Sequence, residues 1–163
     1  MRIPGLSWRS VLLVVALPAV LVAAGPVHAT PPDAEHARFA LCGSGPRVTC
    51  VVDGDTFWYQ GTKVRIADIN TPETARPSCR TEAELGERAR LRLLELLNSG
   101  AFTLEVRGRE TDRYGRALRI VTRGGRSLAE TLVAEGLAEA WTGRRGNWCT
   151  AAGHEPGSGR AQS

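Results

Sequence analysis

The chain lacks three features, each of which would point to a different class of protein. It has only four cysteines and no C-x-x-C pair, so a zinc site of the usual close-pair type is not expected. Its longest apolar run, Val11 to Ala24, contains Pro18 and is shorter than the roughly 20 residues that a membrane-spanning helix needs. Its formal net charge is +4 and falls to +2 without Arg2 and Arg9, so overall basicity is a weak argument for nucleic-acid binding.

The first 29 residues have the pattern of a secretory leader. Arg2 and Arg9 form a positive start, the apolar run follows, and Val27 and Ala29 occupy the positions that precede signal-peptidase cleavage. We expect cleavage after Ala29, export to the periplasm or the medium, and no membrane association afterwards. The remaining chain predicts an N-terminal segment at 30–41, one domain at 42–149 and a disordered tail, rich in Gly and Ser, at 150–163.

The four cysteines take on a different meaning in an exported chain. An oxidising compartment favours two disulfides, for which the sequence allows three connectivities. We favour Cys42 with Cys50, which closes a short loop, and Cys79 with Cys149, which would tie the end of the chain to an earlier loop. The sequence alone leaves the other two pairings open.

The first half of the predicted domain reads as a β meander. Arg47 to Val52 and Thr56 to Tyr59 are rich in β-branched and aromatic residues and flank the turn signal Asp53-Gly54. After a second turn at Gln60-Gly61, Lys63 to Ile69 predicts a third strand. Three short antiparallel strands are therefore expected.

The second half adds two helices and two strands. Thr81 with Glu84, and Ser127 with Glu130, form capping boxes that predict helix starts. The first helix is expected to end at Asn98 to Gly100 and to bury Leu85, Ala89, Leu93, Leu96 and Leu97, whereas the second ends at Gly136 and carries Leu128, Leu132 and Val133. Alternation predicts strands at Phe102 to Val106 and around Leu118 and Ile120, joined by a long loop. The fold class is mainly β with helices, and a five-stranded OB-type barrel with two or three helices is the simplest closed arrangement.

Oxygen-bearing side chains are concentrated in one stretch of the meander, each beside a turn, a strand end or a proline. They are Asp53, Asp55, Asp68, Asn70 and Glu73. A hard cation such as calcium takes six to eight oxygen ligands, at about 2.3–2.6 Å. Tight turns could bring several of these side chains together.

Four motifs resemble the staphylococcal nuclease (thermonuclease) family: VVDGDTF, VRIADINTPE, DRYGR and LVAEGLA. They occur in the family's order and spacing, and the similarity runs from about Val48 to Trp141. The resemblance implies an OB-type barrel and calcium-dependent hydrolysis of DNA and RNA, with products that end in a 3'-phosphate. An isolated Asp-Gly turn or loop carboxylate would more often be structural, but four motifs in register favour function.

The resemblance also implies residue roles. Asp55 occupies the position of the first metal carboxylate, Asn70 that of the second, and the Thr71 carbonyl oxygen would be a third ligand. Asp53 and Asp68 are two further candidates, since Asp53 could hold a metal-bound water and Asp68 lies two residues before Asn70. The implied cofactor is Ca²⁺.

The implied catalytic residues are Arg65, Glu73 and Arg116. Glu73 falls at the position of the family's candidate general base, and the two arginines at its phosphate-binding positions. An Arg suits this role because its planar fork can donate two hydrogen bonds to phosphate oxygens. Arg113 and Tyr114, next to Arg116, are expected to join both arginines in binding the nucleotide.

Strand alternation conflicts with a simple version of this site. Val64, Ile66, Asp68 and Asn70 would share one face of a regular strand, with Arg65 on the other. The strand must therefore bulge, bend or end between Ile66 and Asn70.

Two departures from the family pattern open an alternative function. The second metal position is an amide, Asn70, where the family usually has Asp, so the site loses one negative charge and calcium affinity is expected to fall about tenfold or more. No third long helix is expected after the second, and a disulfide through Cys149 could replace it. The leading prediction is an exported monomeric nuclease acting on DNA and RNA, mainly single-stranded or frayed. The alternative is a weak or inactive OB-type single-strand-binding protein, and an oligosaccharide-binding module ranks last because it leaves Arg65 and Arg116 unexplained.

Overall fold

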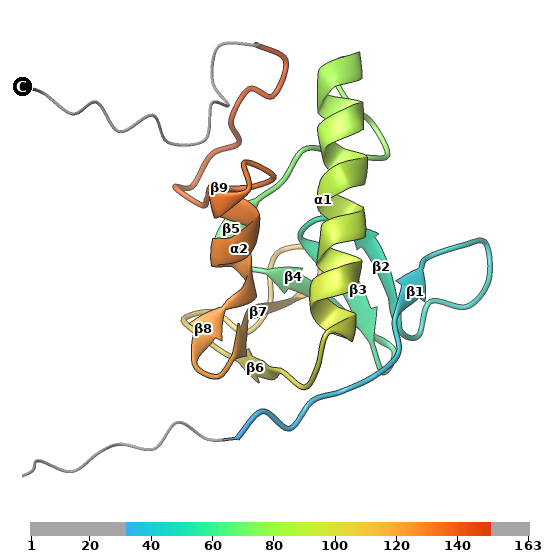
Figure 1. Cartoon of the computed structure of the whole chain (residues 1–163), viewed down its shortest axis with the longest axis vertical. Helices are drawn as coiled ribbons and strands as arrows, with labels where there is room; N and C mark the ends of the chain where they lie inside the picture. The colour runs from blue at the N-terminus through green and yellow to red at the C-terminus, as the bar shows by residue number, and fades with distance from the viewer. Residues whose placement is uncertain (1–31, 151–163) are drawn as a thin grey trace, which may run out of the picture.

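A mixed β-sheet with two helices forms the part of the chain that the computed structural model describes, residues 32–150 (Figure 1). The expected leader at 1–29 lies outside these residues, and so does the expected tail apart from its first residue. No helix within 32–150 is both long enough and apolar enough to cross a membrane. The predicted class, mainly β with helices, is confirmed.

The largest sheet has seven strands, in the spatial order β1-β2-β3-β4-β7-β6 with β8 paired to β7. These strands are β1 (Ala40–Leu41), β2 (Cys50–Asp53), β3 (Thr56–Tyr59), β4 (Thr62–Ile66), β6 (Thr103–Glu105), β7 (Ala117–Arg123) and β8 (Arg126–Ser127). The strands β2, β3 and β4 form the predicted antiparallel meander, and β4 then pairs with β7 in parallel. Two short strands, β5 (Ile69–Asn70) and β9 (Glu139–Ala140), form a separate antiparallel pair.

The end of β4 confirms the predicted break before Asn70. The strand stops at Ile66, so the predicted single strand from Lys63 to Ile69 was wrong at its end: Ala67 and Asp68 form a turn, and β5 begins at Ile69. The turn releases Asn70 from the alternation of β4, and β5 pairs with β9 instead. Arg65 and the residues after Asn70 can therefore face the same site.

The residues before Cys42 pack against the sheet. Glu35 and Phe102 exchange two backbone hydrogen bonds of 2.9 Å, which link the segment before β1 to the residue before β6. The Tyr59 hydroxyl donates a 2.7 Å hydrogen bond to Glu35, and Phe39 is a buried core residue. The N-terminal segment thus contributes to the core of the domain.

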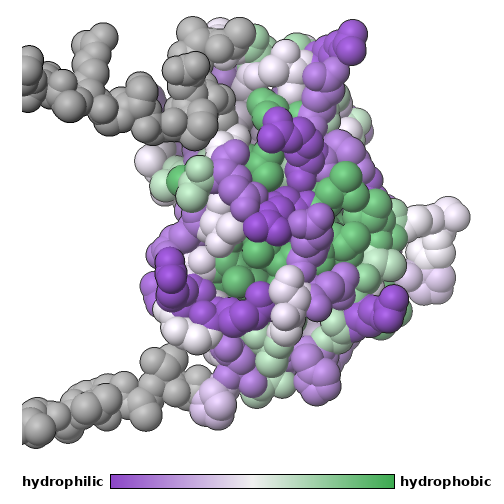
Figure 2. All heavy atoms as spheres, viewed as in Figure 1, coloured by the Kyte–Doolittle hydropathy of each residue, from purple (hydrophilic) through white to green (hydrophobic). Residues whose placement is uncertain are grey.

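Helix α1 (Arg80–Asn98) lies across the sheet, with the shorter α2 (Leu128–Ala134) beside it (Figure 1). Both helices and the sheet share one core, whose fully buried side chains include Phe57, Ile66, Leu93, Leu97, Phe102 and Leu132. The outer side of α1 carries a band of hydrophilic residues, with hydrophobic patches to either side of it (Figure 2). This is the amphipathic pattern that the sequence predicted for α1.

Both helix starts can be compared with the predicted capping boxes. The N-cap of α2 is Ser127, whose hydroxyl accepts from the Ala129 amide, as predicted. The N-cap of α1 is Cys79 rather than Thr81, and its sulfur accepts from the Glu82 amide. The capping-box prediction for α1 was therefore wrong by two residues. The cysteine that takes the N-cap position is also the one bonded to Cys149.

In α2, the buried face is formed by Leu128, Ala129 and Leu132, whereas Val133 is 38% exposed. All three apolar residues named from the sequence thus lie in α2, but Val133 is not part of its buried face.

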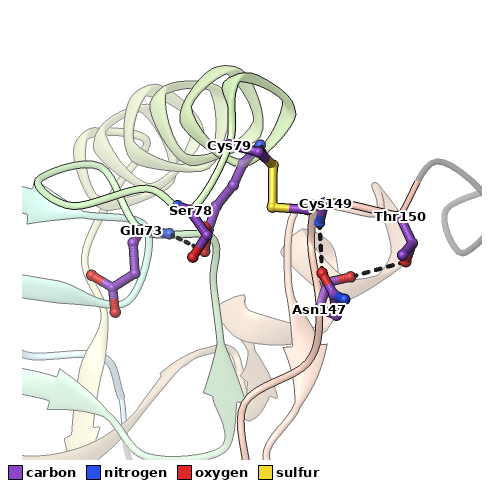
Figure 3. The surroundings of a disulfide bond; sticks show 7 residues. Glu73, Ser78, Cys79, Asn147, Cys149 and Thr150 are labelled. Carbon is purple, nitrogen blue, oxygen red and sulfur yellow. Dashed lines mark hydrogen bonds between the residues drawn. A yellow bond between two sulfur atoms is a disulfide. The ribbon is translucent and has the colours of Figure 1, made fainter.

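The two disulfides have the connectivity that the sequence analysis favoured. Cys42 is bonded to Cys50, and Cys79 to Cys149. The first bond joins residues eight positions apart, beside the start of β2, whereas the second spans 70 positions. The second bond holds the segment after β9 against the N-terminus of α1 (Figure 3). This segment is the part of the chain in which no third long helix was expected.

Replacing both Cys79 and Cys149 by serine should lower the free energy of unfolding by about 2–5 kcal/mol. Serine is a favourable N-cap, so the start of α1 should survive the change and the loss should report the cross-link. Equilibrium denaturant unfolding provides the measurement. The matched control replaces Cys42 and Cys50, whose shorter loop predicts a smaller loss. An unchanged unfolding midpoint in the Cys79 and Cys149 variant would show that this bond does not secure the domain.

Candidate active site

A basic cleft of about 860 Å³ opens beside the end of β4. Its walls come from β4, the loop between β6 and β7, and the segment after β9. One acidic residue, Asp112, lines it together with six arginines: Arg65, Arg107, Arg109, Arg113, Arg116 and Arg145. Such a concentration of positive charge suits an anionic ligand.

Arg65 lines this cleft and is tied to the backbone on both sides of the β4–β5 turn. Its Nη1 lies 2.7 Å from Asp55 Oδ2 and donates to the Ile66 carbonyl at 2.8 Å, and its Nη2 donates to the Ile69 carbonyl at 2.9 Å. The two side chains of the ion pair are only 12% and 10% exposed. Asp55 is therefore the acidic partner of Arg65, whose neighbours in β4 are the apolar Val64 and Ile66. A guanidinium has five N–H donors, so Arg65 retains donors for a ligand.

Asp55 is buried at the turn between β2 and β3 and is bonded on both carboxylate oxygens. Its Oδ1 accepts from the Thr56 hydroxyl at 2.9 Å, and its Oδ2 accepts from the Thr71 amide at 3.1 Å. Burial and the neighbouring Asp55 carboxylate raise the pKa of Asp53 to about 7. The turn thus places two mutually repelling carboxyl groups, those of Asp53 and Asp55, where they are shielded from solvent.

Gly54, between the two acids, is required for packing. A Cβ atom on Gly54 would lie 2.6 Å from the Ala89 Cβ of α1 and 2.9 Å from Thr71 Cγ2. Its backbone therefore lies against the helix and against the segment that follows β5. This contact brings Thr71 to Asp55.

The remaining candidate ligands divide into two groups. Thr71 contacts Asp55 through its backbone, and the buried Asn70 precedes it, with its side chain donating to Glu139 Oε1 at 3.0 Å. Asp68 Oδ2 instead accepts from the Ser127 hydroxyl at 3.0 Å, so its contact is at the start of α2. Asp55 and Thr71 are therefore in contact, whereas Asp68 is bound to Ser127 at the start of α2.

Glu73 lies in the loop between β5 and α1 (Figure 3), where Glu82 fixes the backbone. The Glu82 carboxylate accepts from the Ser78 amide at 2.6 Å and from the Glu73 amide at 3.4 Å. Burial alone would raise the pKa of Glu82, but these backbone hydrogen bonds outweigh it and lower the pKa below its ordinary 4.5. A Cβ on Gly86 of α1 would lie 2.9 Å from the Glu73 carbonyl oxygen, so glycine permits the close approach of this loop.

The Glu73 side chain is paired with Arg145. Arg145 Nη1 contacts Glu73 Oε1, and Arg145 also lines the cleft. The pair joins the loop before α1 to the segment that the Cys79–Cys149 bond secures. Glu73 is thereby linked to the arginine-lined cleft.

Arg116 lies across the cleft in the loop before β7. Its Nε donates to Asp112 Oδ2 at 2.7 Å, and the backbone amides of Arg116 and Tyr114 both donate to Asp112 Oδ1. Burial would raise the pKa of Asp112, but the hydrogen bonds and charge of Arg116 lower it. Asp112 thus fixes the backbone of this loop and the position of the Arg116 guanidinium.

An aromatic ring projects from the same loop. Tyr114 is 68% exposed, and the guanidinium carbons of Arg113 and Arg116 lie 4.8 Å and 5.6 Å from its ring centroid. Trp141, which is 44% exposed, lines the cleft as well. Exposed aromatic rings among arginines are the elements from which single-strand-binding surfaces are built.

Comparison with known proteins identifies the family. The sequence profile described as "Staphylococcal nuclease homologue" matches residues 63–152, more than half of the chain. The chain belongs to this family.

Three relatives illustrate the similarity within the staphylococcal nuclease family. The chain is 45% identical over 92 residues to Endonuclease YncB of Bacillus subtilis, which covers 53% of this chain and 43% of the relative. It is 46% identical over 92 residues to SPbeta prophage-derived endonuclease YokF of the same organism, with 53% and 31% covered. It is 32% identical over 102 residues to Thermonuclease of Staphylococcus intermedius, with 60% of each covered. The chain therefore spans less than half the length of the first two relatives.

The donors present suit a hard cation, although they carry little charge. Within residues 32–150, no group of three or more His, Cys, Asp and Glu side chains is placed to hold a metal ion. The candidate set is instead one carboxylate, Asp55, one amide oxygen, Asn70, and the backbone carbonyl of Thr71. All three are oxygen donors of the kind that calcium accepts, and water can supply the rest.

Sequence reasoning missed Arg107, Arg109 and Arg145 as cleft residues, and Glu139 as the partner of Asn70. The paired arginines were visible in the sequence. R-G-R at 107–109 lies just before the motif DRYGR, and G-R-R at 143–145 lies after the motif LVAEGLA. Glu139 had no signal, because its contact with Asn70 depends on the pairing of two-residue strands far apart in the chain.

Replacing Glu82 by Gln should lower the free energy of unfolding of the domain at neutral pH by about 1–3 kcal/mol. The new side chain has only one oxygen, and its NH₂ group cannot accept a hydrogen bond from the second backbone amide. The lowered pKa of Glu82 means that its stabilisation is present above the ordinary value of 4.5 and lost as the pH falls through the folded value. The difference between the two proteins should therefore shrink as the pH falls below 4.5. Unfolding curves from pH 3 to 7 provide the measurement. Glu84→Gln, on the exposed side of the same helix turn, is the control and should show little difference. A difference that is the same at every pH would contradict this role.

Proposed function

We propose that the chain is an exported, calcium-dependent endonuclease that hydrolyses phosphodiester bonds of DNA and RNA and leaves 3'-phosphate ends. The observation that carries the proposal is the cleft in which Arg65 and Arg116 lie among four further arginines, with Asp55 bonded to Arg65. A nucleic-acid backbone is the anion that such a surface suits, because it presents one phosphate after another. The names of the relatives, two endonucleases and a thermonuclease, support hydrolysis.

The exposed Tyr114 and Trp141 favour single-stranded or frayed substrates, because unpaired bases can stack on aromatic rings. The leader pattern and the two disulfides support export to an oxidising compartment. We further propose that the domain acts as a monomer and is an OB-type barrel. The hydrogen bonds between Glu35 and Phe102 support closure of the barrel, because they link the segments that precede the two outer strands of the sheet, β1 and β6.

The residues that would hold calcium are Asp55, through its carboxylate, Asn70, through its amide oxygen, and Thr71, through its carbonyl oxygen. Asp53 is close enough to receive a hydrogen bond from the Asp55 amide, at 3.2 Å, and is a candidate for holding water beside them. When bound, calcium would supply positive charge that offsets the negative charge growing on the phosphate.

The arginines supply the rest of this charge. Arg116 and the uncommitted donors of Arg65 would bind phosphate oxygens and stabilise the transition state, in which these oxygens gain negative charge. Asp112 and the carbonyls at the β4–β5 turn hold the two guanidinium groups in place beforehand. Such preorganisation is the main source of catalysis in charge-stabilising sites.

Glu73 would accept a proton from the attacking water as the water oxygen bonds to phosphorus and the bond to the 5'-oxygen breaks. The 5'-oxygen leaves with the electron pair of the broken bond and takes a proton from solvent water, and the phosphate remains on the 3' side. Arg145 contacts Oε1 of Glu73, so Oε2 is the oxygen available for the proton. General-base catalysis of this kind contributes about 10²–10⁴-fold.

A plasmid-degradation assay tests the function. Supercoiled plasmid should be degraded in the presence of calcium and remain intact with a calcium chelator, and Glu73→Gln should slow cleavage about 10²–10⁴-fold. Labelled oligonucleotides should yield 3'-phosphate ends. Retarded but uncut plasmid with calcium would instead identify the single-strand-binding alternative, which the amide at Asn70 favours.

Arg116→Lys should reduce kcat about 10²-fold or more, because a lysine cannot reproduce the two-donor fork on the phosphate. The measurement is the initial rate of oligonucleotide cleavage at saturating calcium. Arg126→Lys, at an exposed position of β8, is the matched control and should retain the full rate. Equal rates in both variants would remove Arg116 from the catalytic residues.

A further inference from the structure

Asn70 is held by a carboxylate from a distant part of the chain. Its Nδ2 donates to Glu139 Oε1 at 3.0 Å, and the two residues face each other as a register pair between β5 and β9. The same Glu139 oxygen accepts the Gly146 backbone amide at 2.5 Å. Asn70 is buried and Glu139 is partly buried, so the contact is partly shielded from solvent.

The chemistry of this contact determines the orientation of the amide. A carboxylate only accepts hydrogen bonds, so the NH₂ group of Asn70 must be the part that faces Glu139. The carbonyl oxygen of Asn70 is consequently directed away from Glu139. That oxygen is the one atom of the side chain that can bind a cation.

The contact also alters the charge of the site. An amide at position 70 removes one negative charge, but Glu139 places a carboxylate within hydrogen-bonding distance of that amide. The pair Asn70 and Glu139 together therefore carries the single negative charge that an aspartate at position 70 would carry alone. Asp68, the compensating carboxylate considered from sequence, is engaged with Ser127 instead.

We propose that Glu139 is a positioning residue for calcium: it orients the Asn70 carbonyl oxygen and supplies the negative charge that position 70 lacks. This role rests on the proposed calcium-dependent function. Glu139 acts through Asn70, and its bond to the Gly146 amide holds the segment that carries Arg145. The calcium half of the site and the segment bearing Arg145 are therefore joined at one carboxylate.

The proposal makes an unusual prediction for Asn70→Asp. A new carboxylate would face Glu139 at about the 3.0 Å of the present contact, and the two acids would repel each other. Asn70→Asp alone should therefore fail to tighten calcium binding by more than about threefold, although it adds a negative charge. A simple count of charges predicts a gain of about tenfold or more.

The test compares the unchanged protein with Asn70→Asp, Glu139→Gln and the exchanged pair, in which both substitutions are present. Calcium affinity is measured by titration calorimetry and by the calcium-dependent rise in Tm, neither of which requires activity. Glu139→Gln should weaken binding about tenfold, because Gln keeps an acceptor for Asn70 but loses the charge. The exchanged pair should return to within about threefold of the unchanged protein.

Glu130→Gln, on the exposed side of α2, removes the same charge elsewhere and should leave affinity unchanged. Unfolding measured without calcium distinguishes the proposed role of Glu139 from a merely structural one. A merely structural role would lower the stability of Glu139→Gln without changing its calcium affinity. Equal affinity of Glu139→Gln and Glu130→Gln, or no recovery in the exchanged pair, would overturn the role of Glu139 while leaving the nuclease proposal intact. An absence of calcium binding and calcium-dependent cleavage in the unchanged protein would overturn both.

Discussion

The ion pair between Arg65 and Asp55 is the contact around which the candidate site is assembled. Arg65 joins the turn after β2 to the turn after β4, because the same guanidinium binds Asp55 and the carbonyls of Ile66 and Ile69. Its charge offsets that of a buried carboxylate, whose desolvation would otherwise be costly. The turn that these bonds stabilise ends β4 and lets β5 begin. Arg65 therefore has a structural role as well as its proposed role in phosphate binding.

The second half of the site depends on close packing against α1. The glycines at 54 and 86 allow the Asp55 turn and the Glu73 loop to approach the helix, where a methyl group would meet other atoms at less than 3.0 Å. Glu82 binds the loop backbone, and the Cys79–Cys149 bond draws the segment with Arg145 to the same helix end. Helix α1 is thus the common support for the two acidic residues of the site, Asp55 and Glu73.

Local signals made much of this arrangement predictable from sequence. The meander, the apolar face of α1 and the disulfide pairing each follow from spacing, alternation or the small number of possibilities. The end of β4 does not, because the local pattern predicted a strand through Ile69 and only the resemblance required a break before Asn70. The N-cap of α1 was misplaced because a cysteine took a position that local propensity gives to Thr81. The pairing of β5 with β9 was not predictable, because two-residue strands have no periodicity and their stability comes from tertiary packing. Glu139 belonged to that unpredictable part.

The amide at position 70 illustrates why a single residue type is a poor guide to the charge of a site. Read along the chain, Asn70 is a lost carboxylate, and the nearest acid, Asp68, is the natural substitute. In the fold, Asp68 lies on the α2 side of the turn and Glu139 lies beside Asn70. A cation responds to charge in space rather than in sequence, because Coulomb energy depends on distance. The relevant unit is therefore the pair Asn70 and Glu139. Asn70 provides the oxygen ligand and Glu139 the negative charge, whereas one aspartate would provide both.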